Sequence, residues 1–109
     1  MTSDSNNDAR RGRCSICSQL KDYEYALQTH GRPEEDTFIP KIAEKFKHVR
    51  EVKPSRGRYM ALVKCQECAT YYTYGKDYEY LATGSEDEQF LTRLTDQDAS
   101  EYLAQPLLD

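Results

Sequence analysis

Several stretches of this 109-residue chain have the patterns of β-strands, either alternating apolar and polar residues or a short apolar run. The first stretch covers residues 23–27, and the next two, 59–63 and 70–74, lie on either side of a short polar segment. A glycine-containing turn is expected at 75–77, followed by a further short strand at 78–81. The pattern therefore predicts a small set of antiparallel β-hairpins.

Helical patterns occupy other parts of the chain. Apolar residues recur at spacings of three, four and three over residues 39–49, which predicts a helix at about 40–50. A strand over 46–53 fits the same residues, because short apolar runs do not distinguish the two. The Ser-Glu-Asp-Glu segment at 85–88 has the form of a capping box and predicts a short helix. A similar segment at 95–98 predicts a second helix.

Composition indicates one small domain with a lean core. Hydrophobic residues make up 38% of the chain and the mean hydropathy is −0.90. We expect a single α+β domain at residues 10–109, preceded by a disordered polar tail at residues 1–9. No run of 18 apolar residues and no apolar N-terminal stretch occurs. We therefore predict a cytoplasmic protein with no membrane span, whose thiols stay reduced.

All four cysteines of the chain belong to two C-x-x-C motifs, formed by Cys14 with Cys17 and by Cys65 with Cys68. Two residues between thiols allow a tight turn to direct both sulfurs at one point, so two such motifs supply the four ligands of a tetrahedral zinc ion. In a reducing compartment this set indicates a metal site rather than two disulfides. We predict one structural Zn²⁺ on these four cysteines, which stabilises a lean core.

The two motifs resemble those of zinc-ribbon proteins, small bacterial ones among them, in which two C-P-x-C-G knuckles on hairpins hold one zinc ion. The resemblance covers the cysteines and the hairpin at about 59–74, and it implies a zinc-ribbon-like fold of antiparallel hairpins with short packing helices. The 47 residues between Cys17 and Cys65 lie outside it. Ser18 and Ala69 stand where the family favours glycine, which predicts some strain or a different turn, because glycine tolerates positive φ.

Other cysteine chemistries fit the sequence less well. A rubredoxin-like iron electron-transfer protein is an alternative, although that family also favours glycine after each knuckle. A zinc finger using His30 would need a second histidine three to five residues later, but 17 residues separate His30 from His48. A thioredoxin-like redox role would need one exposed motif at a helix start. Four cysteines on one ion leave no position for water, so we do not expect an enzyme.

Charge is segregated along the chain, although the net charge is only −4. Residues 41–64 carry eight Lys and Arg against two Glu, a net of +6. Residues 74–109 carry two basic and nine acidic residues, a net of −7. Two functions from different classes follow from this asymmetry.

The acidic, Tyr-rich region favours a protein-interaction module for a basic partner, because tyrosine is enriched at interfaces and charge complementarity selects partners. An inhibitor or immunity-type protein that shields a bacterial toxin nuclease would work in this way. The residues predicted to bind the partner are Tyr78, Glu79, Tyr80, Glu86 and Asp87. The alternative is a nucleic-acid-binding zinc ribbon that uses the basic 41–64 segment, with Arg56 and Arg58 at a hairpin tip as phosphate contacts.

One short sequence occurs twice. Lys-Asp-Tyr-Glu-Tyr at residues 21–25 recurs at residues 76–80, and each copy follows a C-x-x-C motif. The repeat fits either a duplicated knuckle-and-strand unit or chance similarity between two Tyr-rich strands.

Overall fold

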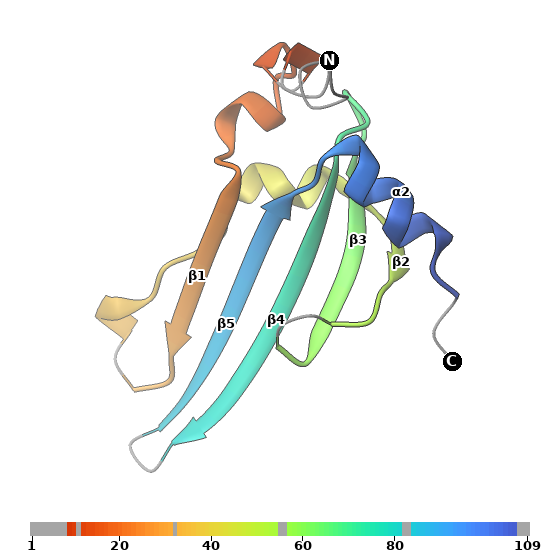
Figure 1. Cartoon of the computed structure of the whole chain (residues 1–109). Coiled ribbons are helices and arrows are strands. Elements are labelled where there is room, and N and C mark those ends of the chain that lie inside the picture. Colours follow the sequence, from red (N-terminus) through yellow and green to blue (C-terminus); the bar gives the residue numbers. More distant parts are fainter. Residues whose placement is uncertain (1–8, 11, 32, 55–56, 82–83, 107–109) are drawn as a thin grey trace.

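The computed structural model describes residues 9–106 except 11, 32, 55–56 and 82–83 (Figure 1). These residues form a five-stranded sheet with the order β1-β5-β4-β3-β2, in which every neighbouring pair is antiparallel. The strands are β1 (Tyr23–Thr29), β2 (Phe46–Glu51), β3 (Tyr59–Cys65), β4 (Tyr71–Leu81) and β5 (Gly84–Arg93). The helical elements are η1 (Cys17–Gln19), η2 (Pro33–Glu35), η3 (Lys41–Lys45) and α2 (Asp96–Ala104). The described fold is therefore mostly β with some α. Of the tail expected at residues 1–9, only Ala9 is described.

Strand β4 is longer than the sequence pattern predicts. The hairpin of β3 and β4 is confirmed, but the turn expected at 75–77 is wrong, since these residues continue β4. Gly75 and Lys76 pair with both β3 and β5, and Asp77 pairs with β5. Gly75 has a packing role instead. A Cβ atom at this position would lie 2.0 Å from Cε2 of Phe90, whose ring lies over the glycine. The residue is thus glycine because β5 places an aromatic ring against it.

The helix expected at 40–50 is wrong for most of its length. The chain forms a 3-10 turn, η3, and then enters β2, so the alternative of a strand over 46–53 is the closer one. The apolar residues at helical spacing do not form one face of a helix. Ile42 and Phe46 pack on the cluster that contains the cysteines, whereas Val49 packs on the cluster beneath α2. Pairing of Phe46 with Cys65 in the sheet overrides the local pattern.

The helix expected from the capping box at 85–88 is also wrong. These residues belong to β5, which pairs with β4 on one side and with β1 on the other. Two ladders of backbone hydrogen bonds outweigh a local helix signal. The second helix signal is confirmed as α2, where the Thr95 hydroxyl accepts a hydrogen bond from the Asp98 amide at 3.0 Å. Within the described residues, no helix has the length and apolarity needed to cross a membrane.

The sheet separates two apolar clusters. On one face, residues 39–43 and Phe46 pack against a buried group that includes the first three cysteines. On the other face, α2 buries Ala99 against a group from β3 and the adjoining segments (Figure 1). The first group is Cys14, Ile16, Cys17, Leu20, Val63, Cys65, Tyr72 and Leu91, and the second is Val52, Met60, Leu62, Leu94 and Ala99. The cysteines are therefore part of a core, at one end of the sheet.

The repeated Lys-Asp-Tyr-Glu-Tyr segments do not occupy equivalent places. The copy at 21–25 enters β1, the copy at 76–80 lies within β4, and β5 runs between them. Across β5, Tyr23 lies level with Thr73, so that Tyr78 is five residues further along the sheet. The two copies therefore do not form a pseudo-symmetric pair, and chance similarity explains them better than a duplicated unit.

Candidate metal centre

The four cysteine sulfurs all lie within 4.8 Å of one another, where β3 ends and β4 has yet to begin. The Sγ atoms of Cys14 and Cys65 are 3.5 Å apart, and those of Cys17 and Cys68 are 3.6 Å apart. Tetrahedral Zn–S bonds of about 2.3 Å correspond to sulfur–sulfur distances of about 3.8 Å, whereas a disulfide requires about 2.05 Å. The four thiols are free, and their arrangement fits one tetrahedral metal ion.

The second knuckle is the turn of the β3–β4 hairpin. The Ala69 amide donates to the Cys65 carbonyl at 3.0 Å, and the Cys65 amide donates to the Thr70 carbonyl at 2.9 Å. Ala69 has a φ of 64°, the single positive value among the non-glycine residues that the structure describes. The strain expected where the zinc-ribbon pattern has glycine is therefore confirmed for this knuckle.

The first knuckle is built differently. It precedes β1 and passes into η1, with the Ser18 amide donating to the Cys14 carbonyl at 3.1 Å. Ser18 lies inside this 3-10 helix, so its backbone does not need the left-handed region. Only the second knuckle sits on a hairpin. The chain thus combines one hairpin knuckle with one helical knuckle.

This difference predicts opposite effects for two matched substitutions. Ala69→Gly should raise the free energy of unfolding by about 0.5 kcal/mol, because relief of left-handed strain exceeds the added freedom of the unfolded chain. Ser18→Gly should lower this free energy by roughly 0.5–1 kcal/mol. The backbone of the 3-10 turn has no left-handed strain to relieve, and glycine loses more conformational freedom on folding than serine does. Urea denaturation of the metal-loaded proteins measures both values. Effects of the same sign would contradict the assigned backbone geometry.

The knuckles also contact each other without a metal. The carboxylate of Glu67, in the second knuckle, accepts the Ser15 amide at 2.8 Å and also the Ser15 hydroxyl, in the first. These hydrogen bonds lower the pKa of Glu67 below its usual range. The stability that this contact contributes is therefore fully present above the pKa of a glutamate in the unfolded chain. It is lost as the pH falls through the lower pKa of Glu67 in the folded chain. Gln66 of the second knuckle also donates to the carbonyl of Lys45, at the end of η3, at 2.8 Å.

Burial sets the electrostatics of the thiols. Cys14, Cys17 and Cys65 are buried, and burial raises the pKa of Cys14 and, further, that of Cys17. Burial also acts on the half-buried Cys68, but hydrogen bonds with Thr70 outweigh it, so that its pKa falls. A dication supplies the positive charge that makes buried thiolates favourable, and its binding releases their protons. The cluster is therefore suited to hold a cation.

The two histidines lie outside the ligand cluster. His30 forms an ion pair with Asp87 at 2.8 Å, and His48 is exposed on β2. Neither joins the sulfurs.

The residues predicted to bind a partner are divided between the two faces of the sheet. Tyr78 pairs with Asp87 on one face, and Glu86 lies on the other, because neighbouring strand positions alternate. The side chains of Glu79 and Tyr80 lie outside the described residues. These five assignments remain predictions.

The two arginines predicted to contact nucleic acid lie before β3. Arg56 is outside the described residues. Arg58 is exposed, and its Nε atom lies 3.6 Å from a carboxylate oxygen of Asp77.

Two exposed tyrosines escaped the sequence-based site assignment. Tyr23 and Tyr25 are 44% and 39% exposed on the edge strand β1, and the Tyr25 hydroxyl donates to Glu88 of β5. The sequence signal for these two tyrosines is the alternation at residues 23–27, which places both rings on one face of the strand. Alternation alone cannot show whether another element covers that face. In this fold α2 packs over β3, away from the edge strand β1.

Comparisons of the chain with protein-family models, with curated proteins and with solved structures find no match.

Proposed function

We propose that this protein is a non-catalytic zinc-binding module whose four-cysteine site is structural. The support is the donor set, in which Cys14, Cys17, Cys65 and Cys68 together fill a tetrahedron and leave no position for a water or substrate. The cysteines also belong to the core and join the N-terminal segment to β3 and β4. An ion bound there stabilises the fold directly. Reduced thiols of this kind suit a cytoplasmic protein.

The zinc-stabilised sheet would present an acidic hairpin to a basic protein partner. Pairing of β3 with β4 ends at Lys76, and pairing of β1 with β5 ends at Glu86, but β4 and β5 continue together to Leu81 and Gly84. The β4–β5 hairpin therefore projects beyond the rest of the sheet (Figure 1). A two-stranded hairpin that projects from a sheet gains little stability from packing. A role in binding would explain why the chain forms one here.

The projecting hairpin carries the expected chemistry. Asp77, Glu86 and Asp87 lie at its base, where β1 still pairs with β5, and Tyr78 of the same region is 41% exposed. A partner that holds the hairpin from both sides would reach residues on either face of the sheet, which accommodates the division of the predicted contacts. Tyrosine rings supply apolar contact area, and the carboxylates supply charge complementarity. An inhibitor or immunity-type protein for a basic nuclease would use such a surface.

Charge reversal on the hairpin tests this proposal. The triple variant Glu79→Lys, Glu86→Lys and Asp87→Lys should lose partner capture in a pull-down while keeping its zinc and its melting temperature within a few degrees. The changes lie far from the cysteines, and the one side-chain contact with His30 that Asp87→Lys removes is solvent-exposed. Capture by the wild type should fall as salt is added. The matched reversal Arg56→Glu with Arg58→Glu should change little. Loss of capture only in the arginine variant, together with micromolar binding of RNA or DNA, would instead support the nucleic-acid alternative.

A further inference from the structure

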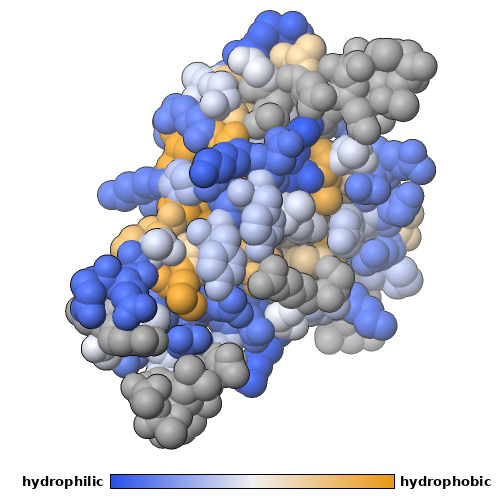
Figure 2. All heavy atoms as spheres, turned by 60° about the vertical axis from the view of Figure 1, so that its left-hand side comes forward, coloured by the Kyte–Doolittle hydropathy of each residue, from blue (hydrophilic) through white to orange (hydrophobic). Residues whose placement is uncertain are grey.

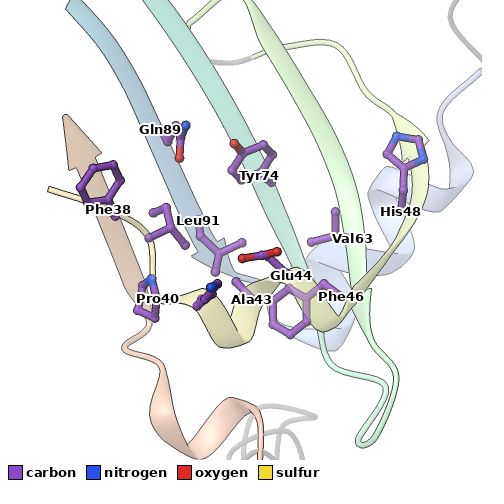
Figure 3. A pocket seen from close by; sticks show the side chains of 12 residues that line it. Phe38, Pro40, Ala43, Glu44, Phe46, His48, Val63, Tyr74, Gln89 and Leu91 are labelled. Atoms are coloured by element: carbon purple, nitrogen blue, oxygen red, sulfur yellow. The ribbon is translucent and has the colours of Figure 1, made fainter. Parts of the chain in front are cut away.

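A groove of about 330 Å³ lies between residues 38–46 and the face of the sheet opposite α2 (Figure 3). This volume is within the range of protein ligand sites. The lining residues are Phe38, Ile39, Pro40, Lys41, Ala43, Glu44, Phe46, His48, Val63, Tyr74, Gln89 and Leu91. They come from the segment before β2 and from four strands, so the groove is a feature of the folded chain. It is separate from the projecting part of the β4–β5 hairpin.

The groove is apolar at its base and at one wall. Val63 and Leu91 belong to the buried core, and the ring of Phe38 is 71% exposed beside them. Figure 2 shows the side that lies to the left in Figure 1, where apolar patches (orange) interrupt a mainly hydrophilic surface (blue). The Phe38 ring and the apolar residues of the groove form one continuous apolar surface, and such a surface rimmed by polar residues is typical of an interaction site.

Cations flank the groove without acidic partners. Lys41 lies in its wall, and the Nζ atom of Lys76 lies 5.9 Å from the centre of the Tyr74 ring, which lines it. In the described part of the chain, neither lysine forms an ion pair with a carboxylate. Three arginines elsewhere do form such pairs, namely Arg10 with Asp96, Arg58 with Asp77 and Arg93 with Asp22. The groove therefore combines apolar surface with two lysines that no carboxylate of the described residues neutralises.

We propose that this groove binds an acidic peptide segment of a partner protein through one large apolar side chain. The apolar side chain would enter between Phe38 and the aliphatic residues of the sheet, and the acidic flanks would lie against Lys41 and Lys76. A peptide is favoured over nucleic acid because of Glu44, whose carboxylate points toward the middle of the groove in Figure 3. A nucleic acid carries a phosphate at every nucleotide, so some phosphates would lie against this carboxylate. A peptide can instead place its apolar side chain there and its acidic side chains beside the lysines.

Peptide selection tests the class of ligand. A displayed library of random dodecapeptides is selected on the zinc-loaded wild type. We expect enriched peptides to carry a net negative charge and at least one Phe, Leu, Ile or Trp. An enriched peptide is then labelled with fluorescein, and its affinity is measured by anisotropy. Absence of enrichment, or enrichment of basic or wholly polar peptides, would overturn the proposal.

Matched variants test the contacts. Phe38→Ser and Lys41→Glu should each weaken binding about tenfold, whereas Glu44→Gln should strengthen it about threefold by removing a like charge. Leu103→Ser removes an exposed apolar side chain on α2, outside the groove, and Lys53→Glu reverses a lysine in the hollow beside α2, so both should leave affinity unchanged. Zinc content and melting temperature identify any variant that is misfolded. Unchanged affinity in Phe38→Ser, or equal losses in the two controls, would refute the site.

Two other occupants give distinct results. A labelled dT20 oligonucleotide that binds more tightly than the peptide, with the same dependence on Phe38 and Lys41, would assign the groove to nucleic acid. Sedimentation that shows a dimer of the wild type, lost in Phe38→Ser, would assign it to a second copy of the chain. Either result would overturn the peptide proposal.

Discussion

Replacing Cys65 with serine will leave the chain without a cooperative unfolding transition at 25 °C. Cys65 is only 1% exposed and lies in the core cluster, where it joins the end of β3 to the N-terminal knuckle. Structural zinc contributes roughly 10–16 kcal/mol of apparent binding free energy, which matches or exceeds the 5–15 kcal/mol stability of typical domains. Loss of one of four ligands therefore removes more stability than a small core can supply.

Circular dichroism and thermal melting of Cys65→Ser measure this effect, and elemental analysis of the natively purified wild type measures the metal. We expect one zinc per chain and loss of it in the variant. Ser18→Ala, next to Cys17 but not a ligand, should keep both the zinc and the melting curve. Less than about half a zinc per wild-type chain would contradict the assigned metal, and a red protein containing iron would support the rubredoxin-like alternative. A wild-type melting curve in Cys65→Ser would show that the metal is not structural.

Gly75→Ala should destabilise the protein by about 3 kcal/mol, the largest effect we expect away from the metal. The added Cβ would lie 2.0, 2.7 and 2.8 Å from three atoms of the Phe90 ring. The ring cannot move away easily, because it is buried and a Cβ at Gly57, on its other side, would lie only 3.0 Å from it. Overpacking of this kind costs about 1–3 kcal/mol or more, which exceeds the small strand preference of alanine over glycine.

A double-mutant cycle identifies the cause of that loss. Gly75→Ala combined with Phe90→Leu should be less destabilising than the sum of the single changes, with a coupling energy of at least about 1 kcal/mol. Gly12→Ala is the matched control, since a Cβ there meets no atom within 4 Å, and its stability should equal that of the wild type or exceed it slightly. Additive effects of the two substitutions would show that Phe90 is not what requires glycine at position 75.

The cluster of four cysteines could be predicted from the sequence because the chemistry of each motif is local. Spacing alone places Cys14 with Cys17, and Cys65 with Cys68, on two tight turns, and a complete set of four thiols indicates a tetrahedral ion. The β3–β4 hairpin and the start of α2 were predictable for the same reason. A turn that closes over a few residues, and a Thr95 side chain that caps its own helix, depend on neighbours in the chain.

The remaining strands were decided by contacts between distant segments. Residues 85–88 carry a helix signal, yet they are strand because β1 and β4 flank them on both sides. Residues 46–51 likewise become β2 because Phe46 pairs with Cys65 of β3. Each added ladder satisfies backbone hydrogen bonds and buries apolar area, and together these outweigh propensities of a few tenths of a kcal/mol per residue.

The sequence by itself determined the cluster of four cysteines that could hold a metal ion, the segregation of charge and the mainly antiparallel hairpin character of the fold. Only the tertiary structure decided which strands lie at the edges, that the β4–β5 hairpin projects, and that an apolar groove opens beside Phe38. The physical reason is that ligand spacing and charge are properties of short segments. Exposure of a side chain depends instead on what packs over it, and that is set by pairings between residues far apart in the chain.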